Sequence, residues 1–331
     1  MKRILTLTLV VSLAAASSAF ATIEGAWTAT PSKKDSSRIQ LNITMEPNSN
    51  NGMSMPLSAF TGLTSAQVYG SAPGAVQFQL RREAGTATFD GSFRNGYGAG
   101  QLTFTGNSQY EQAIRSLGID FDLERHGRTR NPERMLFELA LFDVSTDYIR
   151  TMKALGFNET LNKYLEMRIF DITPEYVHEM ESLGFGKATA RELIDSRIHR
   201  VTPEFVRSMR AAGFNLTLRQ YQEAGIHGMD VEFANEMRKY GYNRLDFNDL
   251  VAFRIHGVTP KFIEELRTLG YTNVDADDLV AMRIHGVTPD FIRRVNNAGY
   301  KNVPVSKLVE MRIFNVDPDM LRKLDDAQRS H

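Results

Sequence analysis

The seven residues Arg-Ile-His-Gly-Val-Thr-Pro occupy positions 254–260, and the same seven letters return at 283–289. Aligned on the Ile of this motif, the chain repeats itself every 28 or 29 residues. The aligned column contains Ile169, Ile198, Ile226, Ile255, Ile284 and Ile313, with Leu141 as an earlier copy. A fixed period of this length predicts a repeat array in which each unit is a pair of short helices.

The residues after the Ile predict a joint between two helices. Two places after it stands Gly, Asn or Asp in every copy except Arg200, and these residues tolerate the left-handed conformation that closes a helix. An apolar residue follows, and then a Ser, Thr or Asp that can cap a new helix. Pro often comes next, at the first helical position. Local structure therefore explains the recurrence of Gly-Val-Thr-Pro without any active site.

Each new helix carries an aromatic residue near its start and ends at a Gly followed by Phe or Tyr, as in Leu269-Gly270-Tyr271. A second helix of about ten residues then leads to the next joint. A half-unit at 110–119 begins the array. We therefore expect an α-solenoid of ~29-residue helix-pair repeats over 107–324, followed by a polar tail at 325–331.

Residues 22–106 have a different composition, which is rich in Gly, Ser, Thr and Asn. Residues 86–93 and 101–105 alternate apolar and polar residues around the turn-forming Asn95-Gly96, which indicates a β-hairpin. Residues 27–29, 38–45 and 76–82 supply three further candidate strands. The sequence thus predicts an α+β protein: a small N-terminal antiparallel β-domain of five or six strands, followed by the helical array.

The first 21 residues resemble a bacterial secretory signal, with Lys2 and Arg3, an apolar run and an Ala-x-Ala ending. Cleavage is expected after Ala21, with a periplasmic or secreted destination. No later run is apolar for long enough to predict a membrane span. The chain has 39 basic and 39 acidic residues and no cysteine. This balance gives no reason to expect nucleic acid as a partner, and the absence of Cys excludes thiol catalysis.

A His column, one place after the Ile, contains His199, His227, His256 and His285. These four could form a metal ladder, but successive repeats lie ~8–10 Å apart, too far for two imidazoles to share one zinc ion. The same column holds Phe142, Phe170 and Phe314. We interpret it as a half-buried aromatic position at a helix end, and we expect neither a metal nor a cofactor.

An Arg column stands one place before the Ile. It contains Arg168, Arg197, Arg254, Arg283 and Arg312. Helix capping does not require Arg at this place. One interpretation is a ladder of salt bridges near helix ends, with partners such as Glu166, Asp195, Glu310 or the acids of the next helix. The other is a row of guanidinium groups that binds carboxylates of a partner, and on this interpretation the five arginines are the candidate binding residues.

Signatures of enzymes are missing from the sequence. His178-Glu179 lacks the second His of a zinc-binding His-Glu-x-x-His helix, and there is no Gly-x-Ser-x-Gly elbow or phosphate-loop lysine. Paired carboxylates of a hydrolase can come from distant parts of a chain, so their absence as a motif decides nothing.

With its Arg-Ile-His-Gly-Val-Thr-Pro and Leu-Gly-Tyr signals, the region 107–324 resembles uncharacterised exported bacterial proteins. It is also similar to the repeat-bearing tails of some membrane metallopeptidases of the beta-lactam-sensor type. The chain lacks their metal-binding helix and their membrane spans, so the resemblance implies a sensing or scaffolding role outside the cytoplasm and no protease activity.

The leading hypothesis is a non-catalytic interaction module that binds a protein or peptide of the cell envelope through the solenoid surface. The alternative is an envelope hydrolase or carbohydrate-binding protein with its site in the β-domain or at the junction with the array. A third possibility is that the Arg column binds an anionic glycan or lipid head group. The sequence leaves the oligomeric state open.

Overall fold

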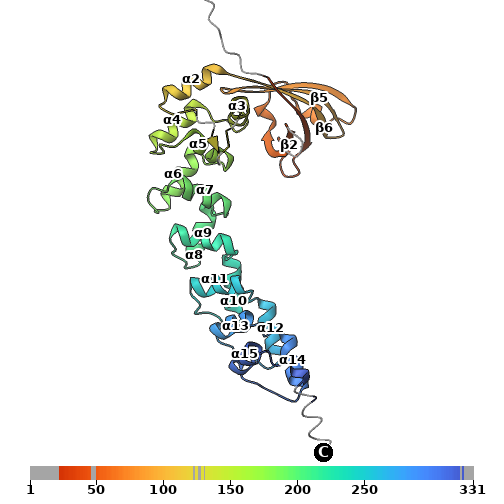
Figure 1. Ribbon diagram of the computed structural model, residues 1–331, viewed down its shortest axis with the longest axis vertical. Coiled ribbons are helices and arrows are strands. Elements are labelled where there is room, and N and C mark those ends of the chain that lie inside the picture. Colours follow the sequence, from red (N-terminus) through yellow and green to blue (C-terminus); the bar gives the residue numbers. More distant parts are fainter. Residues whose placement is uncertain are drawn as a thin grey trace, which may run out of the picture. The chain divides into compact units, whose positions relative to one another are not determined.

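The computed structural model describes residues 22–45, 50–121, 124–125, 128–129, 131–320 and 323. The expected signal peptide and the polar tail lie outside these residues. An antiparallel sheet comes first and helices follow in tandem (Figure 1), which confirms the predicted α+β class with helical repeats. The chain divides into two compact units between Tyr176 and Val177, each described by itself below.

The sheet has six antiparallel strands in the order β3-β2-β1-β6-β5-β4. They are β1 (Ile23–Pro31), β2 (Arg38–Thr44), β3 (Asn50–Pro56), β4 (Gly74–Arg82), β5 (Gly85–Arg94) and β6 (Tyr97–Gly106). All five strands expected from the sequence are present. The edge strand β3 was not among them, and neither were the short helices η1 (Leu57–Ala59) and α1 (Ser65–Tyr69).

The predicted hairpin joins β5 to β6 through Asn95 and Gly96 alone. Both residues have positive φ angles, 50° and 76°, and Arg94 pairs with Tyr97 across the turn. This is the backbone that a two-residue hairpin of right-handed twist requires. The alternation also holds, because Ala87, Phe89 and Phe93 are buried on one face as expected.

Trp27 lies at the centre of the sheet's core and is 1% exposed. Its ring packs edge-on against Phe78, with ring centroids 5.2 Å apart, and against Phe89 at 6.2 Å. Gly98 makes room for this cluster, because a Cβ there would lie 2.5 Å from the Phe93 ring and 2.8 Å from Trp27. Gly98 therefore serves close packing beside the hairpin.

Helices α2 to α15 follow the sheet. In unit 1 they are α2 (Ser108–Ser116), α3 (Pro132–Leu141), α4 (Thr146–Ala154) and α5 (Leu161–Ile169), and α6 (Pro174–Ser182) begins at its end. The remaining helices are α7 (Ala190–Ile198), α8 (Pro203–Ala211), α9 (Leu218–His227), α10 (Val231–Lys239), α11 (Phe247–His256), α12 (Pro260–Thr268), α13 (Ala276–Ile284), α14 (Pro289–Asn297) and α15 (Val305–Ile313). Two-residue strands β7 (Glu124–Arg125) and β8 (Arg128–Thr129) pair between α2 and α3. Among the described residues, no helix is long and apolar enough to cross a membrane.

The joints have the predicted capping structure. Every residue two places after the Ile column is left-handed, with φ between 54° at Asp143 and 70° at Gly257, and the exceptional Arg200 adopts φ 58°. The next helix begins at a capping side chain. Thr202, Thr259 and Thr288 accept hydrogen bonds from the backbone N–H of Phe205, Phe262 and Phe291. The joints thus satisfy backbone groups that a helix end leaves unpaired.

The β-domain is fastened to the first joint within unit 1. The Glu83 carboxylate, just after β4, accepts a hydrogen bond of 2.9 Å from the backbone N–H of Thr146, the first residue of α4. The Tyr110 hydroxyl, on α2, donates to the Val144 carbonyl, and burial raises the pKa of Tyr110 so that this donor stays protonated. Phe104 of β6 meets Phe137 of α3 with ring centroids 5.2 Å apart. The sheet thereby covers the first end of the helices in this unit.

In the second unit, equivalent helices of successive repeats stack on one another: α9 contacts α11, α11 contacts α13, α13 contacts α15, and α12 contacts α14. Tyrosines after the first helices link the same repeats. The Tyr242 hydroxyl donates to the Val274 carbonyl at 2.8 Å, and Tyr271 donates to Val303 at 2.7 Å. The second helices α9, α11, α13 and α15 therefore form one continuous row.

Candidate functional site

The arginines of the Arg column bind the preceding repeat. The Arg283 Nε–H donates to the carbonyl oxygen of His256 at 3.1 Å, and the Arg312 Nε–H donates to His285 at 3.3 Å. In unit 1 the Arg168 Nε–H donates to Phe142 at 2.9 Å. These carbonyls belong to residues at the end of the preceding second helix, where no partner exists within the helix and the helix dipole favours a cation.

The same guanidinium groups lie over aromatic rings. The guanidinium carbons of Arg168, Arg254, Arg283 and Arg312 are 5.1, 4.6, 5.0 and 5.2 Å from the ring centroids of Tyr148, Phe233, Phe262 and Phe291. Each ring belongs to the aromatic column and lies on the first helix of the arginine's own repeat. A guanidinium within ~6 Å of a ring centroid is attracted to the ring face. The carbonyl bond therefore links the arginine to the preceding repeat, and the cation–π contact links the two helices of its own repeat; we call this pair of contacts the clamp.

The three carboxylates named as salt-bridge partners of this column pair with other residues. Glu166, Asp195 and Glu310 form ion pairs with Lys163, Arg191 and Lys307 of their own helices. Side chains three or four residues apart on a helix are neighbours, so these local pairs form at little entropic cost. An ion pair to the column occurs at Asp143, whose carboxylate is 3.8 Å from Arg168.

The left-handed residue of each joint matches the column residue of the next repeat. A Cβ at Gly228, Gly257 or Gly286 would lie only 2.8, 2.9 or 3.1 Å from Nη2 of Arg254, Arg283 or Arg312. The guanidinium therefore rests directly on the cap glycine. One repeat departs from this pattern at both positions. Arg200 replaces the Gly, Asn or Asp of the joint, and Gly225 replaces the arginine in the second helix that follows this joint. A guanidinium at 225 would meet both a side chain and a like charge.

The clamp leaves part of three arginines exposed. Arg254, Arg283 and Arg312 are exposed side chains, and none of the ion pairs among the described residues includes them. Arg168 and Arg197 are half-buried. The structure therefore separates the five candidate residues into two half-buried ones and three that carry an uncompensated positive charge on α11, α13 and α15.

An exposed isoleucine stands beside each of these arginines. Ile226, Ile255, Ile284 and Ile313 are 54%, 51%, 55% and 53% exposed, and Ile198 is 48% exposed. Leu141, the first copy, is buried, but all six isoleucines that follow it are exposed. Single exposed apolar residues are common, but the same large apolar side chain exposed at the same place in six successive repeats is not explained by packing. We name the row formed by Ile226, Ile255, Ile284, Ile313, Arg254, Arg283 and Arg312 the Ile–Arg stripe.

The His column behaves as a helix-end position. His199, His227 and His256 are half-buried, and His285 is exposed. Their backbone carbonyls matter more than their rings, since those of His256 and His285 accept the arginine bonds. The described residues contain no group of three or more His, Asp or Glu side chains that could hold a metal ion.

Sequence reasoning missed a second basic column, three places before the Gly that ends each first helix. The Arg238 and Arg267 guanidinium groups donate to the carbonyls of Ala212 and Tyr240 at 3.3 and 2.6 Å, and Lys153 Nζ donates to Leu117 at 2.8 Å. These carbonyls end the first helices of the preceding repeats. The signal was a recurrent Lys or Arg at this position, at 153, 210, 238 and 267.

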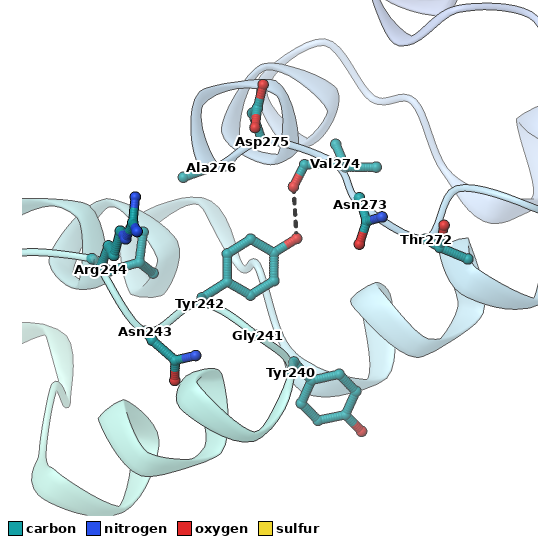
Figure 2. A pocket seen from close by; sticks show the side chains of 11 residues that line it. Tyr240, Gly241, Tyr242, Asn243, Arg244, Thr272, Asn273, Val274, Asp275 and Ala276 are labelled. Atoms are coloured by element: carbon teal, nitrogen blue, oxygen red, sulfur yellow. Dashed lines mark hydrogen bonds between the residues drawn. The ribbon is translucent and has the colours of Figure 1, made fainter.

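Hollows also recur between repeats. Figure 2 shows one of about 380 Å³ between the loops 240–245 and 272–276, with the Tyr242 hydroxyl pointing to the Val274 carbonyl. A second, of about 500 Å³, lies between 118–120 and 158–160 in unit 1. Both lie between loops of successive repeats that each follow a first helix, so the hollows result from the stacking of repeats.

Comparison of the chain with protein-family models, with curated proteins and with solved structures finds no match.

The clamp predicts a measurable loss of stability. Replacing Arg283 by Met keeps the aliphatic stem but removes the bond to His256 and the contact with the Phe262 ring, and should lower the free energy of unfolding by about 1–2 kcal/mol in urea titrations. Arg293→Met is the matched control, since Arg293 pairs only with exposed Asp290 at 4.0 Å, and should change stability by less than about 0.5 kcal/mol. Equal effects would contradict the clamp.

Proposed function

We propose that this protein is a non-catalytic interaction module of the bacterial cell envelope, and that the Ile–Arg stripe binds an acidic segment of a partner protein. The observation that carries the proposal is the exposed isoleucine repeated on α9, α11, α13 and α15. Burial of such side chains against a partner releases water from apolar surface. The three exposed guanidinium groups beside them favour a partner with carboxylates.

The repeat spacing specifies the partner further. Equivalent helices in packed repeats lie ~8–10 Å apart. A polyproline-II segment rises ~3.1 Å per residue with three residues per turn, so every third side chain of such a segment falls on the same face at a similar spacing. The expected ligand is therefore an extended peptide with apolar residues at about every third position and acidic residues between them.

The proposed function can be tested with a photo-crosslinking residue in place of Ile255. We expect benzoylphenylalanine at 255 to crosslink an acidic protein segment in living cells, whereas the same residue at the exposed position 264 of α12 gives no such product. The crosslinked peptide, identified by mass spectrometry and then synthesised, should bind the purified chain. Ile226→Ser with Ile284→Ser should weaken that binding at least tenfold, about 1.4 kcal/mol.

Several outcomes would contradict the proposal. Identical products from positions 255 and 264 would mean that the stripe is not a preferred surface. A crosslinked lipid or glycan, with binding that falls steeply as salt is added, would instead favour the anionic head group or polysaccharide. The stripe isoleucines are better probes than the arginines, because Arg→Glu changes would also break the clamp between repeats.

A further inference from the structure

A separate hollow of about 650 Å³ lies within unit 1, where the sheet meets the first joint. Its lining combines Arg38 of β2 and Arg82 of β4 with Arg168 of α5, so three guanidinium groups from three elements converge on one space. The carboxylates of Asp143 and Asp171 line it too. A volume of several hundred Å³ with a few convergent polar groups is typical of sites for small organic molecules.

The charges in this hollow are not balanced. The Asp143 carboxylate lies between two arginines, with Oδ1 3.0 Å from Arg82 Nε and Oδ2 3.8 Å from Arg168 Nη2. Among the described residues, the Arg38 guanidinium donates to the neutral Ser54 alone, to its hydroxyl at 3.0 Å and its carbonyl at 2.7 Å. Three guanidinium groups against two carboxylates leave one positive charge in the lining.

Arg82 also has bonding capacity left. Its Nε is buried 3.0 Å from the Asp143 carboxylate, in an ion pair that does not have the geometry of a hydrogen bond, and its Nη1 donates to the Arg81 carbonyl at 3.1 Å. A donor held in a poorly aligned contact gains less than one with a well-placed acceptor. An oxyanion in the hollow could supply a better-placed acceptor, since guanidinium forks match the oxygen spacing of carboxylate and phosphate groups.

The remaining wall is apolar. Met53 and Met55 of β3 line the hollow together with Leu141 and Ile169 of the helices. Ile169 is 37% exposed, less than the later members of its column. Methionine side chains adapt readily to differently shaped apolar groups. A ligand that fills this space would therefore carry a charged head and a short hydrocarbon part.

We propose that this hollow is a binding site for a small amphipathic oxyanion, a carboxylate or phosphate monoester with a short hydrocarbon chain. Arg38, Arg82 and Arg168 bind the head group, and the apolar wall of Met53 and Ile169 accepts the chain. The site is independent of the Ile–Arg stripe, because its lining lies wholly in unit 1.

The test is calorimetric titration of the chain with hexyl phosphate, hexanoate, inorganic phosphate and hexanol. We expect at least one of the two hexyl anions to bind with a dissociation constant below about 1 mM, inorganic phosphate to bind more weakly, and hexanol not to bind. The tighter of the two anions identifies the head group. Arg38→Gln should weaken binding about tenfold, whereas Arg81→Gln, whose side chain is bonded to Gln79 outside the hollow, should leave it unchanged.

A second variant keeps the test decisive if Arg38→Gln disturbs the β2–β3 edge. Ile169→Asp places a carboxylate on an already exposed position of the wall and should abolish binding of the hexyl anion while the circular dichroism spectrum stays unchanged. No binding of either hexyl anion to the parent chain would overturn the proposal. Equal weakening by Arg38→Gln and Arg81→Gln would overturn it as well, because it would indicate unspecific attraction to positive charge.

Discussion

Replacing Trp27 by alanine should lower the free energy of unfolding of the β-domain by about 4 kcal/mol. The indole is 1% exposed and is surrounded by Phe78, Phe89 and Phe93. Removing it takes away its apolar contact area and leaves a cavity. The three phenylalanines belong to β4 and β5. The backbones of these strands are held in place by hydrogen bonds to their neighbours in the sheet, so the cavity collapses only in part.

The measurement is equilibrium urea unfolding followed by far-ultraviolet circular dichroism. Tyr97→Ala is the matched control, since this aromatic residue in the same sheet is 62% exposed and its truncation should change stability by less than about 0.5 kcal/mol. A loss below about 1 kcal/mol for Trp27→Ala would contradict the assignment of Trp27 as the centre of the sheet's core.

Restoring the consensus arginine at position 225 should destabilise the array by about 2 kcal/mol. In this repeat the helix α9 approaches the end of α7 so closely that a Cβ at 225 would lie 2.1 Å from the His199 carbonyl oxygen. The two helices would have to separate to admit any side chain. The new guanidinium would also face Arg200, which occupies the cap position that is Gly in the other clamped joints of the second unit.

Gly225→Ala separates this packing effect from charge. Helix propensity alone predicts that Ala inside a helix is more stable than Gly by about 1 kcal/mol. The contact with the His199 carbonyl predicts the opposite sign, because even a methyl group does not fit. Thermal unfolding of both variants decides the matter: a raised midpoint for Gly225→Ala would show that α9 is not held against the preceding repeat as described.

The helix joints were predictable because their causes are local. A Thr that caps, a Pro in the first turn and a Gly in the left-handed conformation act within a few residues of one another, as at 257–260, and the sequence states them directly. The recurrence of these capping residues in successive repeats then shows that their spacing is not due to chance. The hairpin at Asn95-Gly96 was predictable for the same reason.

Strand β3 was not predictable, because its residues Asn50–Pro56 are Asn- and Gly-rich and carry little strand propensity. It pairs with β2 over seven residues as the outer strand of the sheet, and that pairing is a tertiary effect. The attachment of Glu83 to Thr146 was equally hidden, since the two residues are 63 positions apart.

The candidate site was predictable as a column of residues but not as a set of contacts. The sequence shows arginines one position before the Ile, and carboxylates were predicted as their partners because opposite charge was the only basis for choosing a partner. The backbone carbonyl of the preceding helix carries no sequence signature, so the bond from Arg283 to His256 could not be foreseen. The exposure of Ile284 depends on how neighbouring repeats stack, which a single repeat does not reveal.

The clamp also has a direction. Every contact in it runs from an arginine to groups earlier in the chain: a carbonyl at the end of the preceding repeat and a ring on the first helix of its own repeat, as Arg312 shows with His285 and Phe291. The ribosome synthesises the N-terminal part first, so the groups that each clamp arginine contacts already exist when that arginine is synthesised. The β-domain is synthesised before all the repeats, and it provides the surface on which the first helices pack. The clamp contacts of each new repeat therefore need only residues that have already been synthesised, whereas the bonds from Tyr242 and Tyr271 form only with the repeat that follows.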